Sequence, residues 1–273
     1  MGHEKEALNL FLTENINEAK QITEKLNKYN RDRQEIEKRI FNEAVEIIES
    51  KEDKTQNAIV IGSKDWHHGV IGIVSSKITE MYFKPSILIA FEGEEGKGSG
   101  RSIVGFDLHD ALCNCSDYLE KYGGHEMAVG LSLKKSQFEN FKNKFESIAD
   151  SAKIDEFVPV IHVDKQINIK DVRCDIVEEI NKLEPFGEGN KVPIFLYKNL
   201  KVDSIRSLSD GKHLRLTLKD GSTIINAIGF NMGSLSNDYL IGDKVDILGV
   251  LEINVFNGKS TVQINIKDIM KSY

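Results

Sequence analysis

Cysteine is scarce in this chain of 273 residues, which contains only Cys113, Cys115 and Cys174. Three cysteines cannot form a disulfide framework, and Cys113 and Cys115 lack the two-residue spacer of zinc knuckles and thioredoxin-like sites. We therefore expect no metal site in this chain. Unpaired cysteines are typical of a reducing compartment, so we expect a cytoplasmic protein.

Long hydrophobic runs and an excess of basic residues are also absent. The longest apolar runs, such as residues 58–61 and 87–91, are far shorter than the roughly 20 residues that span a bilayer. The first residues form no apolar signal-peptide core, so we expect no membrane partner. The net charge of −7 excludes a globally basic nucleic-acid binder but not a locally basic groove. With 40% hydrophobic residues, the chain has enough apolar side chains for two folded domains.

Proline and glycine are missing between Gly2 and Gly62. This segment is rich in helix-forming residues, and its apolar positions recur at helical spacing. We predict a short helix over residues 4–12 and a long helix that runs from the capping sequence at Asn15 to about residue 50. A helix of this length, roughly 50 Å, typically bridges domains; the alternative is a helix that lies along the core of its own domain.

Strand and helix patterns alternate between residues 57 and 151, as in an α/β domain. The predicted strands cover residues 57–62, 86–91, 101–104 and 129–133. The predicted helices cover residues 68–82, 108–119 and 136–151, and Asp107 caps the second of them. Gly-rich turns are predicted over residues 92–100 and 122–130.

The pattern changes again after about residue 155, where short strands alternate with turns rich in Gly, Asn and Asp. One predicted helix, over residues 175–183, interrupts the strands. Many short strands at this spacing predict a small β-barrel, so the fold class is α/β plus β. The predicted strands cover residues 158–163, 192–196, 200–207, 213–218, 223–230, 244–252 and 261–269.

A first candidate site is the sequence Gly98-Ser99-Gly100-Arg101-Ser102. Glycines let backbone N–H groups approach an anion, Ser99 and Ser102 add hydroxyl donors, and Arg101 adds a planar fork that matches phosphate oxygens. The alternative is an ordinary Gly-rich hairpin. The predicted phosphate-binding residues here are Ser99, Gly100, Arg101 and Ser102.

A second candidate site is the sequence Gly123-Gly124-His125. Paired glycines allow a tight turn that projects the imidazole of His125 into a cleft, where it can form a hydrogen bond to a phosphate. We therefore predict Gly123 and Gly124 as phosphate-binding positions. The alternative is that His125 is a structural residue.

A third candidate site is the predicted helix start at residues 66–72. The free N–H groups of a helix N-terminus suit an anion, and two histidines lie nearby. As neighbours on a helix, His67 and His68 are expected to point apart. The alternative is a capped helix start with Trp66 buried.

The segment from His213 to Lys219 alternates strictly between leucine and polar residues. Its leucines face the barrel core, so its basic and polar side chains share the outer face. A basic barrel face is suited to the backbone of single-stranded nucleic acid; the alternative is a solvated strand face. The predicted nucleic-acid-binding residues are Lys201, Arg206, Lys212, His213, Arg215 and Lys219. Aromatic side chains for base stacking are sparse, and we expect each candidate to pack in a core: Tyr197, Phe230 and Phe256.

Together these motifs resemble those of RecJ-type single-strand-specific exonucleases, in their order along the chain, over about residues 7–270. The motifs that resemble the family's DHHA1 domain are 66–74, 96–102 with 106–108, and 123–125 with Gly130. Residues 183–190 (LEPFGEGN) resemble the signature at the entry to the family's OB-fold domain, and residues 26–34 resemble the start of its interdomain helix. The sequence departs from the family at His68, where Pro is common, and at Val129, where a small residue is usual.

The resemblance implies three regions and the activity of the whole protein. The regions are an interdomain helix region (1–53), a DHHA1-like α/β domain with a mixed sheet (54–152) and an OB-fold-like nucleic-acid-binding domain (153–273). The activity is 5′→3′ degradation of single-stranded DNA in repair and recombination. Ser99 and Arg101 would hold the terminal 5′ phosphate, and His125 would contact a phosphate near the scissile bond as a catalytic residue.

The family's catalytic centre is a DHH domain whose Asp and His residues bind two Mn²⁺ or Mg²⁺ ions. No Asp-His-His triplet occurs in this sequence. The chain therefore resembles the C-terminal part of a RecJ-like protein, and we expect it to be inactive by itself. The implied partners are single-stranded DNA and the missing DHH domain.

Two other functions stay open. A phosphodiesterase for short oligonucleotides or cyclic dinucleotides would share the DHHA1-like part, although small substrates need no second domain that binds the strand. A stand-alone single-strand-binding module is the non-enzymatic alternative.

Overall fold

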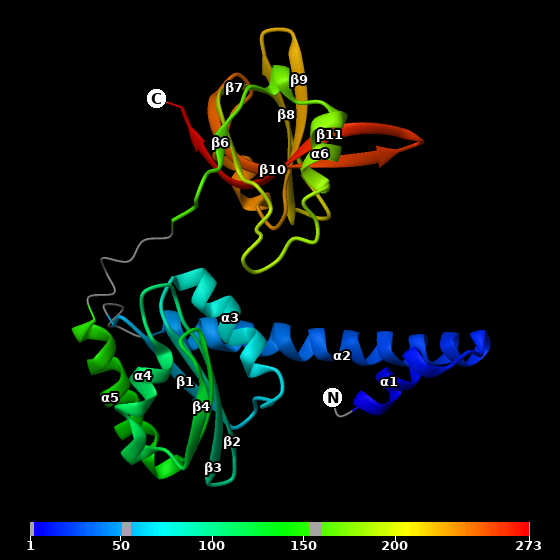
Figure 1. Cartoon of the computed structure of the whole chain (residues 1–273). Coiled ribbons are helices and arrows are strands. Elements are labelled where there is room, and N and C mark those ends of the chain that lie inside the picture. The colour runs from blue at the N-terminus through cyan, green and yellow to red at the C-terminus, as the bar shows by residue number, and fades with distance from the viewer. Residues whose placement is uncertain (1–2, 51–55, 153–159, 273) are drawn as a thin grey trace. The chain divides into compact units, whose positions relative to one another are not determined.

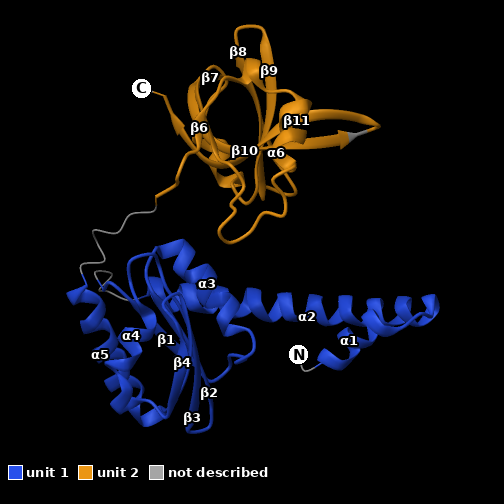
Figure 2. Ribbon diagram, in the orientation of Figure 1, with its two compact units in different colours: residues 1–159 blue, residues 160–273 orange. Residues whose placement is uncertain are grey.

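The computed structural model describes residues 3–50, 56–152 and 160–272, apart from the side chain of residue 256. The chain divides into two compact units, residues 1–159 and residues 160–273 (Figures 1 and 2). Each unit has its own hydrophobic core. In the described part of the chain, no helix combines the length and the apolar character needed to cross a membrane.

Unit 1 begins with the two predicted helices, α1 (Glu4–Leu12) and α2 (Ile16–Glu49). The capping prediction is confirmed, because Oδ1 of Asn15 accepts hydrogen bonds from the first turn of α2. Ile40 and Ala44, in the C-terminal half of α2, are fully buried in the core of unit 1. The N-terminal half is largely exposed and contacts α1.

A five-stranded mixed sheet in the order β1-β2-β3-β5-β4 forms the centre of unit 1. The strands are β1 (Ile59–Ser63), β2 (Ser86–Glu92), β3 (Glu95–Arg101), β4 (Lys121–His125) and β5 (Ala128–Lys134). β1 and β2 are parallel, and the other neighbours are antiparallel. Helices α2 and α3 (Ile71–Tyr82) pack on one face of the sheet, and α4 (Leu108–Cys113) and α5 (Phe138–Ser151) pack on the other (Figure 1).

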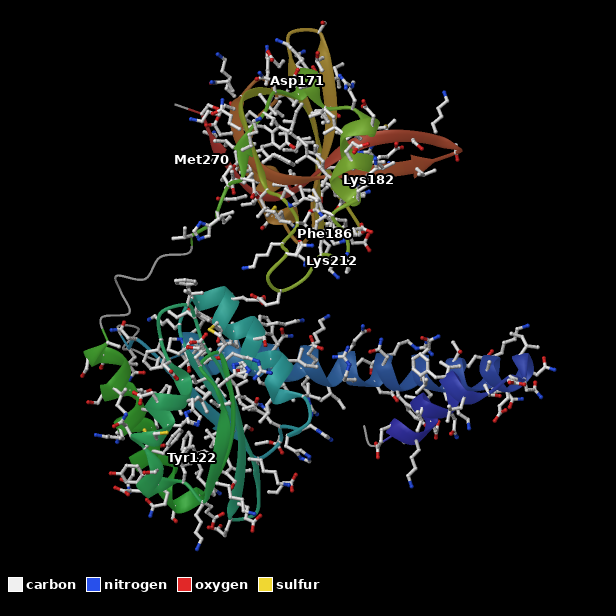
Figure 3. All side chains as sticks on the ribbon, viewed as in Figure 1. Tyr122, Asp171, Lys182, Phe186, Lys212 and Met270 are labelled. Carbon is white, nitrogen blue, oxygen red and sulfur yellow. The ribbon has the colours of Figure 1, made fainter. Side chains whose placement is uncertain are left out.

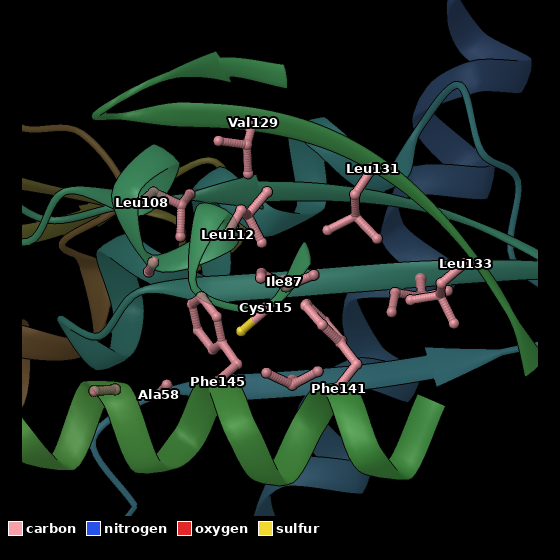
Figure 4. Packing of buried hydrophobic residues seen from close by; sticks show 14 of the residues in the cluster. Ala58, Ile87, Leu108, Leu112, Cys115, Val129, Leu131, Leu133, Phe141 and Phe145 are labelled. Atoms are coloured by element: carbon pink, nitrogen blue, oxygen red, sulfur yellow. The ribbon is translucent and has the colours of Figure 1, made fainter. Parts of the chain in front are cut away.

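The core between the sheet and α5 is shown in Figure 4. Phe141 and Phe145 of α5 are fully buried there against Val129, Leu131 and Leu133 of β5. On the opposite face, alternate residues of β1 and β2 pack against α2 and α3. Both faces of the β1–β2 pair are therefore covered, which explains why these strands read as continuous apolar runs.

The two Gly-rich segments predicted as turns contain tight turns at residues 93–94 and 126–127, but most of their residues lie in strands. Residues 95–101 form β3, and residues 121–134 form the hairpin of β4 and β5. In β3, a Cβ on Gly96, Gly98 or Gly100 would lie within 3.0 Å of a core side chain. These glycines allow close packing rather than a turn, and sequence reasoning does not distinguish the two roles.

Several boundaries also differ from the predictions. Helix α3 begins at Ile71 rather than at residue 68, and the residues predicted as a strand over 101–104 lie mostly beyond the end of β3. The helix predicted over 108–119 ends at Cys113 and is followed by a 3₁₀ turn at Ser116–Tyr118. Its predicted cap is confirmed, because Oδ1 of Asp107 accepts a hydrogen bond from the N–H of Asp110 at 2.9 Å.

Unit 2 is a closed five-stranded barrel in the order β7-β8-β9-β11-β10, with β10 pairing back to β7. Its strands are β7 (Phe195–Leu208), β8 (His213–Asp220), β9 (Thr223–Gly229), β10 (Lys244–Phe256) and β11 (Lys259–Lys271). The β9–β11 pair is parallel. This strand order and the Greek-key path define an OB fold, which confirms the predicted small barrel.

Unit 2 also has a short strand and a helix outside the barrel. A short strand, β6 (Lys165–Gln166), pairs with β7, and helix α6 (Cys174–Asn181) contacts β10 and β11. The strands predicted over 192–196 and 200–207 are one strand, β7. Residues 160–163 are not a strand, and the start of that predicted strand, residues 158–159, lies outside the described residues.

A buried carboxylate connects α2 to α3. Glu37 of α2 is 7% exposed, and it binds Lys77 of α3 at 2.5 Å and Arg33 at 2.6 Å. Burial raises the pKa of Glu37, but the hydrogen bonds and charges of Lys77 and Arg33 outweigh burial and hold this pKa below its ordinary value of 4.5. The folded state therefore favours the ionised carboxylate.

We expect Glu37→Gln to lower the stability of unit 1 by about 1–2 kcal/mol at neutral pH. Because the folded pKa lies below the unfolded one, the stabilisation by Glu37 is present above about pH 4.5 and is lost as the pH falls through the folded pKa. Thermal unfolding of the variant should therefore depend less on acidic pH than that of the parent chain. Glu35→Gln, an exposed change on the same helix, is the control, and identical pH profiles for parent and Glu37→Gln would refute the role of Glu37.

The barrel core contains a phenol without a hydrogen bond. Tyr197 is fully buried, and its hydroxyl has no partner among the described residues. The hydroxyl of Tyr239, which is 8% exposed, donates to the carbonyl of Ile269 at 2.8 Å.

We expect Tyr197→Phe to leave the stability of unit 2 unchanged or raise it by about 1 kcal/mol, and Tyr239→Phe to lower it by about 1 kcal/mol. Chemical unfolding of both variants tests this, and a clear loss of stability in Tyr197→Phe would contradict it.

Candidate nucleic-acid interface

The alternation of β3 places Ser99 and Arg101 on the face of the sheet that carries α3. Ser99 pairs with Leu88, which packs on the α2–α3 side, and both Ser99 and Arg101 are half-buried. A Cβ on Gly72, in the first turn of α3, would lie 2.9 Å from Oγ of Ser99 and 3.4 Å from Nη2 of Arg101. Because position 72 is glycine, the N-terminus of α3 can lie directly against these two side chains.

Arg101 is held in place by its neighbours. Its Nη1 donates to Oγ of Ser99 at 3.2 Å and to the carbonyl of Gly100 at 2.7 Å. The guanidinium and the positive end of the α3 dipole therefore lie together at one edge of the helix. Such a combination of cation, hydroxyl and helix N-terminus suits an anion.

The strand register brings His125 into the same row as Arg101. Arg101 of β3 pairs with Ala128 of β5, and Ala128 pairs with His125 of β4. Residues that pair across strands point to the same face, so Arg101 and His125 flank a small alanine. The exposed ring of His125 accepts the N–H of Met127 at Nδ1 (3.3 Å), which leaves Nε2 as the protonated nitrogen of the neutral ring.

A second row, Ser99–Gly130–Gly123, lies next to the first. A Cβ at Gly123 or Gly130 would meet no described atom within 4 Å, so this part of the sheet is open. Helix α3 packs over β2 and β3, whereas β5 and β4 extend beyond it (Figure 1). The result is a glycine floor bordered by Ser99, Arg101 and His125.

The remaining residues predicted at this site lie elsewhere. Gly100 faces the opposite side, against Val129 and Leu108 in the core. The hydroxyl of Ser102 is buried and donates to the carbonyl of Phe106 at 2.6 Å. Gly124 points to the core side of the sheet as well, since it pairs with buried Val129.

The histidines before α3 do not point apart. Because the helix begins only at Ile71, His67 and His68 lie in the preceding loop and their rings stack, with centroids 5.0 Å apart. The prediction was wrong because it assumed helical geometry there. Nδ1 of His68 lies 3.0 Å from Oε1 of Glu92, and this hydrogen bond holds the pKa of Glu92 below its usual value. The buried position of Trp66 is confirmed, at 4% exposed.

In unit 2, the alternation of β8 is confirmed. Its three leucines are fully buried, and Arg215 is exposed on the outer face. Arg206 of β7 pairs directly with Arg215, so two cations lie opposite each other. Neither forms an ion pair with another described residue. Like charges in this arrangement repel, and a bound anion would relieve the repulsion.

The other predicted basic residues surround this pair. Lys212 lies on the connection between β7 and β8 (Figure 3), and His213 is half-exposed at the start of β8. Lys201 is exposed and pairs with Lys219. Lys219 also binds the carboxylate of Asp203 at 2.5 Å, which neutralises part of its charge.

The three aromatic residues considered for base stacking lie in different environments. Tyr197 is in the barrel core, as predicted, whereas Phe230 is 49% exposed, so the prediction that it packs in a core was wrong. The alternation of β9 contains the missed signal: Ile225 and Ala227 are buried, which places Phe230 with the outward-facing set. The side chain of Phe256 lies outside the described residues.

Comparison with known proteins accounts for most of the chain. Residues 38–151 match the model of the DHHA1 domain, and residues 163–268 match the model of the RecJ OB domain. The chain therefore contains a DHHA1 domain followed by an OB domain, and α1 and the part of α2 before residue 38 precede both matches. This pair of domains is the C-terminal portion of RecJ exonucleases, and the chain belongs to that family.

Individual relatives agree with this assignment. The single-stranded-DNA-specific exonuclease RecJ of Bacillus subtilis is 34% identical over 96% of this chain and 34% of its own length. RecJ of Haemophilus influenzae is 31% identical over 93% of this chain and 46% of its own length. The crystal structure of Thermus thermophilus RecJ in complex with Mn²⁺ superposes with a TM-score of 0.82 at 29% identity, covering 100% of this chain and 39% of that one. The chain thus spans less than half the length of these relatives.

The two adjacent glycines of the β4–β5 hairpin should differ in their tolerance of substitution. Gly124 has φ +142°, and a Cβ there would lie 2.2 Å from the carbonyl of Ala128. We expect Gly124→Ala to cost about 1–3 kcal/mol, and Gly123→Ala to change stability by less than about 0.5 kcal/mol. Thermal unfolding of the two variants measures both values, and equal costs would show that the hairpin geometry is wrong.

Proposed function

We propose that this chain is the DNA-holding part of a RecJ-type 5′→3′ single-strand-specific exonuclease. The observation that carries the proposal is the row in which Arg101 and His125 flank Ala128, beside the glycines of the neighbouring row, Gly130 and Gly123. A flat surface of one alanine and two glycines beside a guanidinium and an imidazole suits a sugar–phosphate chain laid across the strands. The outward-facing cations of the OB domain support a second contact with the strand.

In this proposal the terminal 5′ phosphate binds at Ser99 and Arg101. The guanidinium of Arg101 can form bidentate hydrogen bonds to phosphate oxygens, and Ser99 adds a hydroxyl donor. The nearby N-terminus of α3 favours the negative charge of the phosphate. His125 lies on the other side of Ala128 from Arg101, where it would contact a phosphate further along the strand through Nε2. It is the residue of this chain that we place nearest the scissile bond.

The OB domain then binds the strand by its backbone. Arg206, Arg215, Lys212 and Lys201 supply cations, with His213 and Lys219 beside them. Contacts of this kind position a strand without reading its sequence. Because Lys219 is paired with Asp203, we assign the larger share of binding to the arginine pair.

The related crystal structures of Thermus thermophilus RecJ are complexes with Mn²⁺ and with Mg²⁺. Within residues 3–50, 56–152 and 160–272, no group of three or more His, Cys, Asp or Glu side chains is arranged to hold a metal ion. From the family resemblance we propose that a DHH domain outside this chain binds the metal ions of the whole protein, and we derive no step of hydrolysis here. Repair and recombination in the cytoplasm are the setting that the family suggests.

The two halves of the proposal are tested by substitutions in separate domains. We expect Arg101→Ala to abolish any preference for a 5′-phosphorylated oligonucleotide over the same oligonucleotide with a 5′ hydroxyl. Binding to internal positions should change little, because the OB domain is intact. Arg31→Ala, an exposed arginine of α2, is the matched control. Titration of labelled oligonucleotides measures this, and a preserved preference in Arg101→Ala would overturn the assignment.

The double variant Arg206→Ala with Arg215→Ala should weaken binding to all single strands alike. The slope of log affinity against log salt should become shallower by about 0.7 for each lost phosphate contact. Arg173→Ala removes an exposed arginine of the same unit that is paired with Asp175, so it should leave the slope unchanged. If the double variant binds as tightly as the parent chain at every salt concentration, the OB face is a solvated surface.

A further inference from the structure

The exposed phenyl ring of Phe230 is not explained by the phosphate contacts described above. Phe230 directly follows β9 on the outer face of the barrel and is 49% exposed. An exposed aromatic ring offers a flat apolar face that a partner can cover. Its position next to the arginine pair suggests what that partner is.

The ring is supported from one side. His213 of β8 packs edge-on against it, with centroids 5.3 Å apart and planes at 74°. The imidazole is itself oriented, because its Nδ1 accepts the N–H of Asn231 at 3.0 Å. His213 therefore holds the edge of Phe230 while the exposed part of the ring stays available.

The backbone beneath the ring is also constrained. A Cβ on Gly229 would lie 2.7 Å from Sδ of Met232, which packs against the barrel core. The N–H of Gly233 donates to the carbonyl of Lys212, so the turn after β9 is bound to the loop that carries Lys212. The aromatic ring and the lysine are thus parts of one local structure.

The charges of the arginine pair lie one row of the barrel away from the Phe230 ring. Arg206, Arg215 and Ile228 form one row across β7, β8 and β9, and His213 and Phe230 form the next. Two residues along a strand span about 7 Å. A single nucleotide could therefore place its phosphate at the arginine pair and its base on Phe230.

We propose that Phe230, supported by His213, is a stacking platform for one nucleobase of single-stranded nucleic acid. The proposal rests on the DNA binding proposed above and adds a base contact to it. Stacking accepts any base, because every base has a flat π-face, and this agrees with the sequence-independent backbone contacts proposed above. The adjacent arginine pair favours a polyanionic strand over an apolar protein partner.

The first test separates bases from phosphates. We compare binding of the whole chain to an oligothymidylate and to an abasic oligomer with the same number of phosphates. Phe230→Ala should weaken binding to oligothymidylate by about 5- to 100-fold and leave binding to the abasic oligomer unchanged. The salt dependence should stay the same, because stacking releases no counterions. Met270→Ala, an exposed apolar residue near the end of β11, is the control.

The second test does not depend on loss of function. The chain has one tryptophan, Trp66, which is buried in the other unit. Phe230→Trp should retain binding and place a fluorescent ring at the platform. Oligothymidylate should quench it and the abasic oligomer should not, whereas Met270→Trp should respond to neither.

The outcomes are distinct. If the parent chain binds oligothymidylate and Phe230→Ala binds it equally well, the platform is wrong and the DNA-binding proposal stands. Equal losses for both ligands, or no quenching of Phe230→Trp on binding, also overturn the platform. If the parent chain binds neither oligomer, the DNA-binding proposal fails and the platform fails with it.

Discussion

The close packing of β3 against the core is the constraint on which unit 1 depends. Glycine occupies every second position from residue 96 to residue 100, because core side chains such as Phe91 and Leu131 fill the space that a Cβ would need. The residues between these glycines must face the other side. The alternation that closes the core therefore also presents Ser99 and Arg101 at the N-terminus of α3.

The candidate site follows from how much of the sheet its helices cover. Helices α2 and α3 pack over the parallel pair and β3, while Gly123 and Gly130 on the outer strands carry no side chain. The open part of this sheet face therefore exposes backbone and the small residues Gly123, Ala128 and Gly130 rather than a large apolar surface. Such a surface is stable in water and still admits a polar chain, which is what a sugar–phosphate backbone requires.

The OB domain combines a well-packed interior with an outer face that is not optimised for stability. Leucines of β8 fill the barrel, whereas Arg206 and Arg215 repel each other across two strands and Phe230 stays half in water. The like-charge pair costs the folded state free energy, and the exposed ring gains little from burial. Their position together on one face is what favours function over a solvated surface as their explanation.

The sequence by itself predicted the N-terminal helices, two helix caps and a small barrel, and the family resemblance predicted that this barrel is an OB fold. The absence of Gly and Pro before residue 62 predicted α1 and α2, the caps at Asn15 and Asp107 were found from residue type, and the alternation of β8 identified its outer face. It did not determine that the glycines of β3 form a strand, that Phe230 is exposed, or that Arg101 and His125 share a row. These depend on which strands pair and in which register, and pairing is decided by packing between segments far apart in the chain, where local propensity carries no information.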